Sequence, residues 1–268
     1  MNPLEAVLRH ERAFIMAALA ALTALAWLYV WQGAGMGMTA LAMTQAALFP
    51  HLTPEPMPGM VMAPIAWTTV VLMWWVMMVA MMTPSAAPLV LLYGRVLRHA
   101  AGQGQSGASI APSFFLAGGY LLVWLAFSIA ATVLLYVLQR AGLVSQMMLW
   151  SQNAILSAAV LAGAGIYQFT PLRNACLAHC RSPMQFLTRH MRTGNVGAMT
   201  LGIEHGAWCV GCCWLLMSLL FVFGVMNLLW IALLAVLVQV ERLAPRGVLV
   251  SRLIGVILIG WSIATLLA

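Results

Sequence analysis

A run of cysteines beside a histidine and a glutamate is the part of this sequence best suited to chemistry. It reads Glu-His-Gly-Ala-Trp-Cys-Val-Gly-Cys-Cys and begins at Glu204. Because successive residues of an α-helix turn by about 100°, His205, Cys209, Cys212 and Cys213 would share one face of a helix. Thiolate and imidazole groups are ligands that soft transition metals prefer. The spacing therefore predicts metal ligands on one helix, with Glu204 beside them as a further candidate.

A second group of candidate ligands lies earlier in the chain. Cys176, His179 and Cys180 would share one face of a helix, just after Pro171. They could complete the site of the first group or form a separate one near the cytoplasmic surface, and the sequence leaves both open. All five cysteines fall in segments that we expect in the reducing cytoplasmic half of the protein or near mid-membrane. We therefore expect thiols that bind a metal, and no structural disulfides.

Methionines form a third group. Met73, Met77 and Met81 follow one another at a spacing of four and would make a stripe along a helix. Further candidates lie in the preceding loop, namely Met57, Met60, Met62 and His51. Thioethers are soft, neutral ligands that suit Cu(I), although methionine is also a common gap filler in apolar helices. We therefore expect Met77 and Met81 to line an approach for copper.

The composition shows which kind of protein must position these residues. Hydrophobic residues make up 64% of the 268-residue chain and charged residues only 6%, whereas a soluble domain carries about 25% charged residues. The twelve arginines are too sparse to follow a phosphate backbone, so we expect no nucleic-acid partner. The composition instead predicts an integral membrane protein whose surroundings are the lipid bilayer.

Seven apolar runs predict an all-α, polytopic bundle of about seven transmembrane helices in a single membrane domain, residues 1–268. None of the runs alternates strictly, which excludes a β-barrel. All arginines except Arg140 fall on one side of this topology, and this asymmetry places the N-terminus in the cytoplasm. The expected spans are 13–31, 65–82, 114–138, 148–169, 196–223, 224–241 and 248–267.

Three segments resemble a bacterial family of predicted metal-binding integral membrane proteins, a domain family of unknown function. They are Met-Met-Val-Ala-Met-Met-Thr-Pro-Ser at 77–85, the run 167–183 that ends Cys-Leu-Ala-His-Cys-Arg-Ser-Pro, and the cysteine-bearing run 206–217. The resemblance covers roughly residues 65–240. It implies a bacterial inner-membrane protein that binds metal through these cysteines and nearby histidines and methionines, whereas His205 and His179 are added here from their spacing alone.

Together these features favour a membrane protein that binds a soft transition metal, with Cu(I) ahead of zinc, for metal handling, delivery or transport. One alternative is a membrane thiol–disulfide oxidoreductase that uses Cys176 with Cys180 and Cys209 with Cys212 as redox pairs. Others are a metalloenzyme subunit with Glu204 as proton acceptor and a structural subunit tied together by its metal. No catalytic residue is assigned. A membrane or soluble protein partner and an oligomer both stay open.

Overall fold

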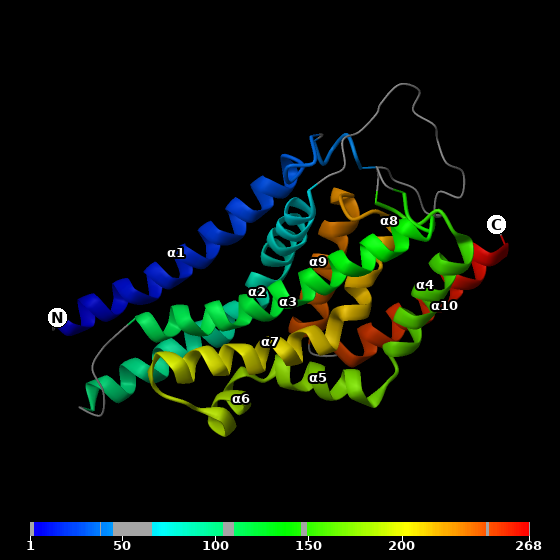
Figure 1. The fold of residues 1–268 in the computed structure, drawn as a ribbon. Helices are drawn as coiled ribbons and strands as arrows, with labels where there is room; N and C mark the ends of the chain where they lie inside the picture. The colour runs from blue at the N-terminus through cyan, green and yellow to red at the C-terminus, as the bar shows by residue number, and fades with distance from the viewer. Residues whose placement is uncertain are drawn as a thin grey trace.

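The computed structural model describes residues 3–37, 39–44, 66–103, 110–145, 149–244 and 247–267, and within these ranges it is built from helices (Figure 1). A single isolated β-bridge, Val144 with Ser151, is the extended pairing that these ranges contain. The expected all-α architecture is confirmed. The helices are α1 (Pro3–Trp31), α2 (Trp67–Gly102), α3 (Ala111–Arg140), α4 (Ala154–Tyr167), α5 (Pro171–Arg181), α6 (Pro183–His190), α7 (Gly194–Ser218), α8 (Leu220–Phe223), α9 (Leu228–Leu243) and α10 (Gly247–Leu267).

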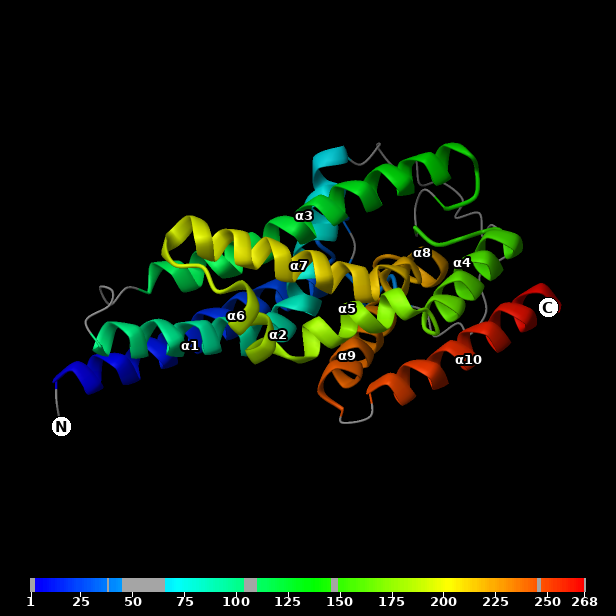
Figure 2. The same cartoon turned by 90° about the horizontal axis from the view of Figure 1, so that it is seen from below.

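The long helices α1, α2, α3 and α7 run side by side, and α10 packs against α4 at the other end of the molecule (Figures 1 and 2). The largest buried cluster joins α2, α3, α7 and α9. Trp74 and Trp124 are fully buried there, together with the methionines of α2. The core is therefore largest where the sulfur-bearing helices meet.

Glycines let α3 and α7 approach each other closely. A Cβ atom on Gly119 would lie 2.2 Å from the carbonyl oxygen of Met199, and one on Gly202 would lie 2.0 Å from that of Leu116. Small residues at helix crossings are the usual device for close packing in membranes, where apolar burial drives association weakly. This contact fixes α7, which carries the cysteine run, against the face of α3 that carries Tyr120.

Five helical segments are long and apolar enough to cross a membrane, and α4 with α5 would make a sixth although they are bent by 65°. This finding agrees in outline with the expected bundle of about seven spans. The difference lies in α9, which has 16 residues and at 1.5 Å per residue would reach only about 24 Å. A bilayer core of about 30 Å is longer than this helix. The five segments are 12–31, 67–100, 111–140, 194–223 and 247–267.

Two expected boundaries were wrong. The second helix does not end before Pro84 and Pro88 but includes both and continues to Gly102, since neighbouring helices can satisfy the backbone groups that proline frees. The fourth begins at Ala154 rather than 148, where Asn153 caps it by accepting a 2.9 Å hydrogen bond from the amide of Leu156. The expected fifth span, 196–223, agrees with the apolar segment 194–223, within which the helix breaks at Leu219 between α7 and the short α8.

Local sequence explains the break between α4 and α5. Thr170 caps α5 through a hydrogen bond from the amide of Arg173, and Pro171 occupies the first turn, where its missing N–H costs nothing. A new helix therefore starts at Pro171 in a new direction. Its buried side carries Cys176 and Cys180 and packs against α7.

Candidate metal centre

The thiols of two helices meet in the buried core. α7 supplies Cys209, Cys212 and Cys213, and α5 supplies Cys180, whose Sγ lies 3.9 Å from that of Cys212. The thiols of Cys212 and Cys213 both donate to the carbonyl oxygen of Cys209 at 3.1 Å. All four are free cysteines and at least nine-tenths buried. We call Cys180, Cys209, Cys212 and Cys213 the thiol cluster.

An arginine from α9 reaches into the thiol cluster. Nη2 of Arg242 lies 2.8 Å from Sγ of Cys209, 3.4 Å from that of Cys212 and 4.0 Å from that of Cys213. The residue is only 8% exposed. Sulfur atoms are thus the hydrogen-bond acceptors that surround a buried guanidinium, and such a cation is costly to bury unless negative charge lies nearby.

Tyr120 of α3 links the thiol cluster to α2. Its hydroxyl lies 2.9 Å from Sγ of Cys209 and 3.1 Å from both the carbonyl oxygen of Met82 and the hydroxyl of Ser85. The tyrosine side chain is 1% exposed. The Tyr120 hydroxyl therefore connects the methionine-rich helix α2 with Cys209 of the thiol cluster.

A buried ion pair fixes α5 to α9. Nη2 of Arg173 lies 2.6 Å from a carboxylate oxygen of Glu241, and both side chains are almost fully buried. Close by, the guanidinium of Arg181 donates to the carbonyl oxygen of Ala244. Arg242 follows Glu241 in the chain, and Cys180 lies on the same helix as Arg173. This ion pair therefore helps to hold Arg242 and Cys180 next to the cysteines of α7.

His205 and Cys176 are buried beside the thiol cluster. The His205 ring lies between Tyr120 and Phe186, with ring centroids 5.9 Å and 5.3 Å away. Neither ring nitrogen of His205 has a hydrogen-bond partner among the described residues, so a nitrogen remains free to bind a ligand. Cys176 instead faces α7 at Gly211, where a Cβ would lie 3.0 Å from its sulfur.

Two further candidate ligands make contacts elsewhere. Glu204 is 29% exposed and accepts a 2.7 Å hydrogen bond from Arg192 in a surface ion pair. The His179 ring stacks on Trp208 with centroids 4.2 Å apart, and its Nδ1 lies 2.9 Å from the carbonyl oxygen of Ala175. The structure thus brings neither side chain into the contacts that join the four thiols.

The methionine stripe is buried along α2. Met77 and Met81 are at most 1% exposed and belong to the same core cluster as the thiols.

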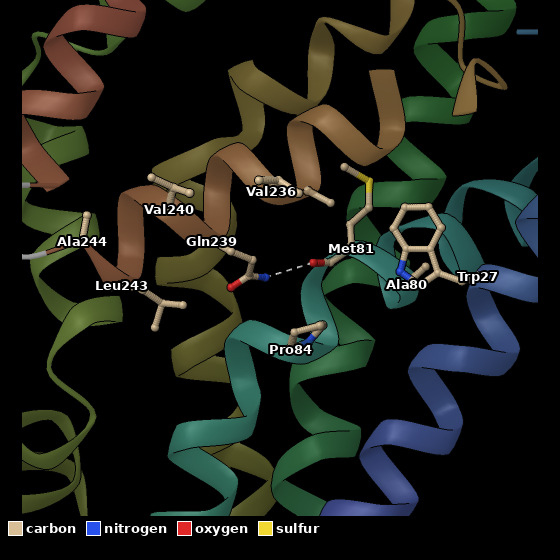
Figure 3. Close-up of a pocket in the computed structure, with 10 residues that line it drawn as sticks. Trp27, Ala80, Met81, Pro84, Val236, Gln239, Val240, Leu243 and Ala244 are labelled. Atoms are coloured by element: carbon tan, nitrogen blue, oxygen red, sulfur yellow. Dashed lines mark hydrogen bonds between the residues drawn. The ribbon is translucent and has the colours of Figure 1, made fainter. Parts of the chain in front are cut away.

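Met81 also lines a groove of about 550 Å³ between α1, α2 and α9, where Gln239 donates a 3.2 Å hydrogen bond to the carbonyl oxygen of Met81 (Figure 3). The groove is mostly apolar, so it is no route for a hydrated ion. Its lining also includes Trp27, Ala80, Pro84, Ala235, Val236, Val240, Leu243 and Ala244. The loop candidates His51, Met57, Met60 and Met62 lie outside the described residues.

The thiol cluster has suitable donors for a soft ion, but its sulfurs are spread around the arginine. Among the described residues, no group of three or more His, Cys, Asp or Glu side chains converges as a metal site requires. Metal–sulfur bonds are about 2.3 Å long, whereas the sulfurs of Cys209, Cys212 and Cys213 lie 2.8–4.0 Å from Nη2 of Arg242. An ion would therefore have to draw two or three thiols inward.

The residues that surround the cysteines were not predicted from the sequence. Arg242 and Arg173 were counted with the arginines that mark the cytoplasmic surface, yet both are buried inside the bundle. Tyr120 and Glu241 fall within the expected spans 114–138 and 224–241, and neither was named as a candidate. A Glu-Arg pair at the end of an apolar run was the available signal, because ionisable residues at such positions are costly and usually functional.

Comparison with known proteins identifies the family. The model of the PpoB2 family, described as copper chaperone, matches residues 71–265, and this chain belongs to that family. The matched residues include the thiol cluster, Arg242 and the methionine stripe. The description of the family names copper and gives no support for zinc. Neither a curated protein nor a solved structure matches the chain.

Proposed function

We propose that this chain is a bacterial inner-membrane protein that receives Cu(I), holds it at Cys180, Cys209 and Cys212, and passes it to a protein partner. The observation that carries this proposal is the meeting of four buried thiols from α5 and α7 in a chain of a copper chaperone family. Soft thiolates bind Cu(I) in preference to harder cations. Burial keeps water and oxidants away from the bound ion.

The arrangement of the thiols also suits transfer. Cys180 lies on the short helix α5, whereas the other three lie on the long helix α7. A copper ion shared between the two helices can be released when α5 shifts, because one of its ligands then leaves. His205, with both ring nitrogens unpaired among the described residues, can serve as a replacement ligand during such an exchange.

The methionines supply the approach to the thiols. Met77 and Met81 are neutral ligands, so copper can pass from one to the next without the release of a proton. Met82 follows them and is joined to Cys209 through the Tyr120 hydroxyl. We therefore infer that copper moves along α2 toward Cys209, from the outer end of the helix inward.

Exposed apolar side chains support the membrane location. The α10 residues Val256 and Ile257 are each 62% exposed, and Val236 on α9 is 61% exposed. Apolar surface of this kind on several long helices suits contact with lipid or with a partner helix. With the predicted N-terminus in the cytoplasm, α5 and α6 would lie near the cytoplasmic face, where a soluble partner could collect the copper.

Cu(I) competition tests the proposal. The purified protein should remove Cu(I) from a chromophoric chelator, and Cys209→Ser and Cys212→Ser should lower its affinity by at least about ten-fold, or about 1.4 kcal/mol. Cys176→Ser is the matched control, since its thiol faces Gly211 and makes none of the contacts that join the four thiols. A protein that takes no Cu(I), or serine variants that bind like the wild type, would refute the proposal.

Thiol trapping separates this proposal from the oxidoreductase alternative. The sequence suggested the redox pairs Cys176 with Cys180 and Cys209 with Cys212, whereas the structure brings Cys180 to 3.9 Å from Cys212, and this contact is the observation that favours the alternative. In that case the two thiols should cycle between reduced and disulfide forms with a partner thiol or quinone, and the protein should retain this cycle without copper. We expect both thiols to stay reduced and to be protected from alkylation by Cu(I).

A further inference from the structure

Arg242 places a buried positive charge at the thiol cluster, and copper binding alone does not explain this charge. Arg242 is 8% exposed, and among the described residues the ion pairs are Arg173 with Glu241 and Arg192 with Glu204. Arg242 therefore has no carboxylate partner within that part of the chain. Its Nε and Nη1 atoms are also buried without a hydrogen-bond acceptor there. The guanidinium brings one uncompensated positive charge to the sulfurs.

The other groups around the cluster add no net charge. Tyr120 contributes a neutral hydroxyl, and His205 contributes a neutral imidazole because burial disfavours its charged form. Arg173 and Glu241 neutralise each other at 2.6 Å. The net charge of the loaded site is therefore the sum of the bound ion, its thiolates and Arg242. When two of Cys180, Cys209 and Cys212 bind Cu(I) as thiolates and the third remains a protonated, neutral thiol, the complex carries one negative charge, and Arg242 makes the whole neutral.

We propose that Arg242 is a built-in counter-cation that makes this site select a monovalent soft ion held by two thiolates. This inference rests on the proposed copper function and adds the basis of its selectivity. Unit charges a few ångströms apart interact strongly in a medium of low dielectric constant. A divalent ion with the same two thiolates forms a neutral complex, so Arg242 gives it no such stabilisation and leaves an excess positive charge.

Silver and mercury separate charge from geometry. Ag(I) and Hg(II) both form linear complexes with two thiolates, but the Ag(I) complex carries one negative charge and the Hg(II) complex none. Purified protein would be equilibrated with an equimolar mixture of both ions, buffered by excess glutathione, and the bound ratio measured by mass spectrometry of the metals. The wild type should retain Ag(I), relative to Hg(II), at least about ten-fold better than a free dithiol does.

Two variants and one control complete the experiment. Arg242→Gln should lower the ratio of bound Ag(I) to Hg(II) by about ten-fold or more, and Arg242→Lys should restore most of it because the charge returns. The surface arginine variant Arg192→Gln should keep the wild-type ratio. A purely structural role for Arg242 would reduce the binding of both ions together and would leave their ratio unchanged.

Each outcome has a separate meaning. If the wild type binds neither Ag(I) nor Cu(I), the proposed copper function fails. If it binds them but Arg242→Gln keeps the wild-type ratio, only the counter-cation inference is overturned. If Arg242→Gln does not fold, the comparison of wild type with the free dithiol decides, and equal ratios for the two would overturn the inference.

Discussion

Replacing Gly119 with alanine should separate the two helices that frame the thiol cluster. The new Cβ would lie 2.2 Å from the carbonyl oxygen of Met199 on α7. The backbone cannot move aside as a flexible side chain could, so α3 and α7 must part. Tyr120 is the next residue on α3, and its hydroxyl contact with Cys209 crosses the same interface.

The size of the effect follows from the contact distances. Ordinary contact between such atoms begins at about 3.4 Å, so the helices must move apart by about 1.2 Å near this glycine. The contact of 2.9 Å between Tyr120 and Cys209 would then exceed hydrogen-bonding distance for the hydroxyl. Overpacking of this kind costs about 1–3 kcal/mol, which outweighs the gain of up to about 1 kcal/mol from replacing glycine with alanine in a helix.

Gly118→Ala is the matched control, because a Cβ at Gly118 meets no atom within 4 Å. Thermal unfolding in detergent should show Gly119→Ala melting several degrees below Gly118→Ala, at about 2–4 °C per kcal/mol. Cu(I) affinity should fall in the first variant only. Equal melting temperatures for the two variants would refute the close approach of α3 and α7.

Two further predictions concern the ion pairs and the methionines. Glu241→Gln should lower the free energy of unfolding by about 3–5 kcal/mol, because it leaves the buried Arg173 without its partner. The surface variant Glu204→Gln should lower it by less than about 1 kcal/mol. Equal free energies of unfolding for the two variants in chemical denaturation would contradict this. Met81→Leu should preserve folding, with a cost below about 1.5 kcal/mol, but it should slow the entry of Cu(I) into proteoliposomes. The exposed control Met184→Leu should leave the rate of entry unchanged. Equal entry rates for the two variants would exclude a copper path along the methionine thioethers.

The helical bundle was largely predictable because membrane helices need continuous apolar runs. The predicted runs 114–138 and 248–267 closely match α3 and α10. Proline was the main source of error, since Pro84 and Pro88 do not end α2. In an aqueous helix they would have ended it, but packed neighbours can stabilise the freed backbone groups in a bundle. The 65° bend before α5 depends on the capping residue Thr170 and was not foreseen.

The candidate site was predictable only within single helices. Helical periodicity correctly places Cys209, Cys212 and Cys213 on one buried side of α7, because their spacing is local. The contact between Cys180 and Cys212 depends on how α5 packs, and the sequence left it open. Arg242 was not predicted as a site residue, because a charged residue at the end of an apolar helix suggests the membrane–water interface. Only the tertiary structure shows that Arg242 is buried in the core.

X-ray absorption at the copper edge of the Cu(I)-loaded protein tests the central claim most directly. We expect one Cu(I) per chain with a first shell of two or three sulfur atoms, and loss of this signal in Cys209→Ser. A first shell of oxygen and nitrogen atoms, or a sulfur shell that survives in Cys209→Ser, would contradict it.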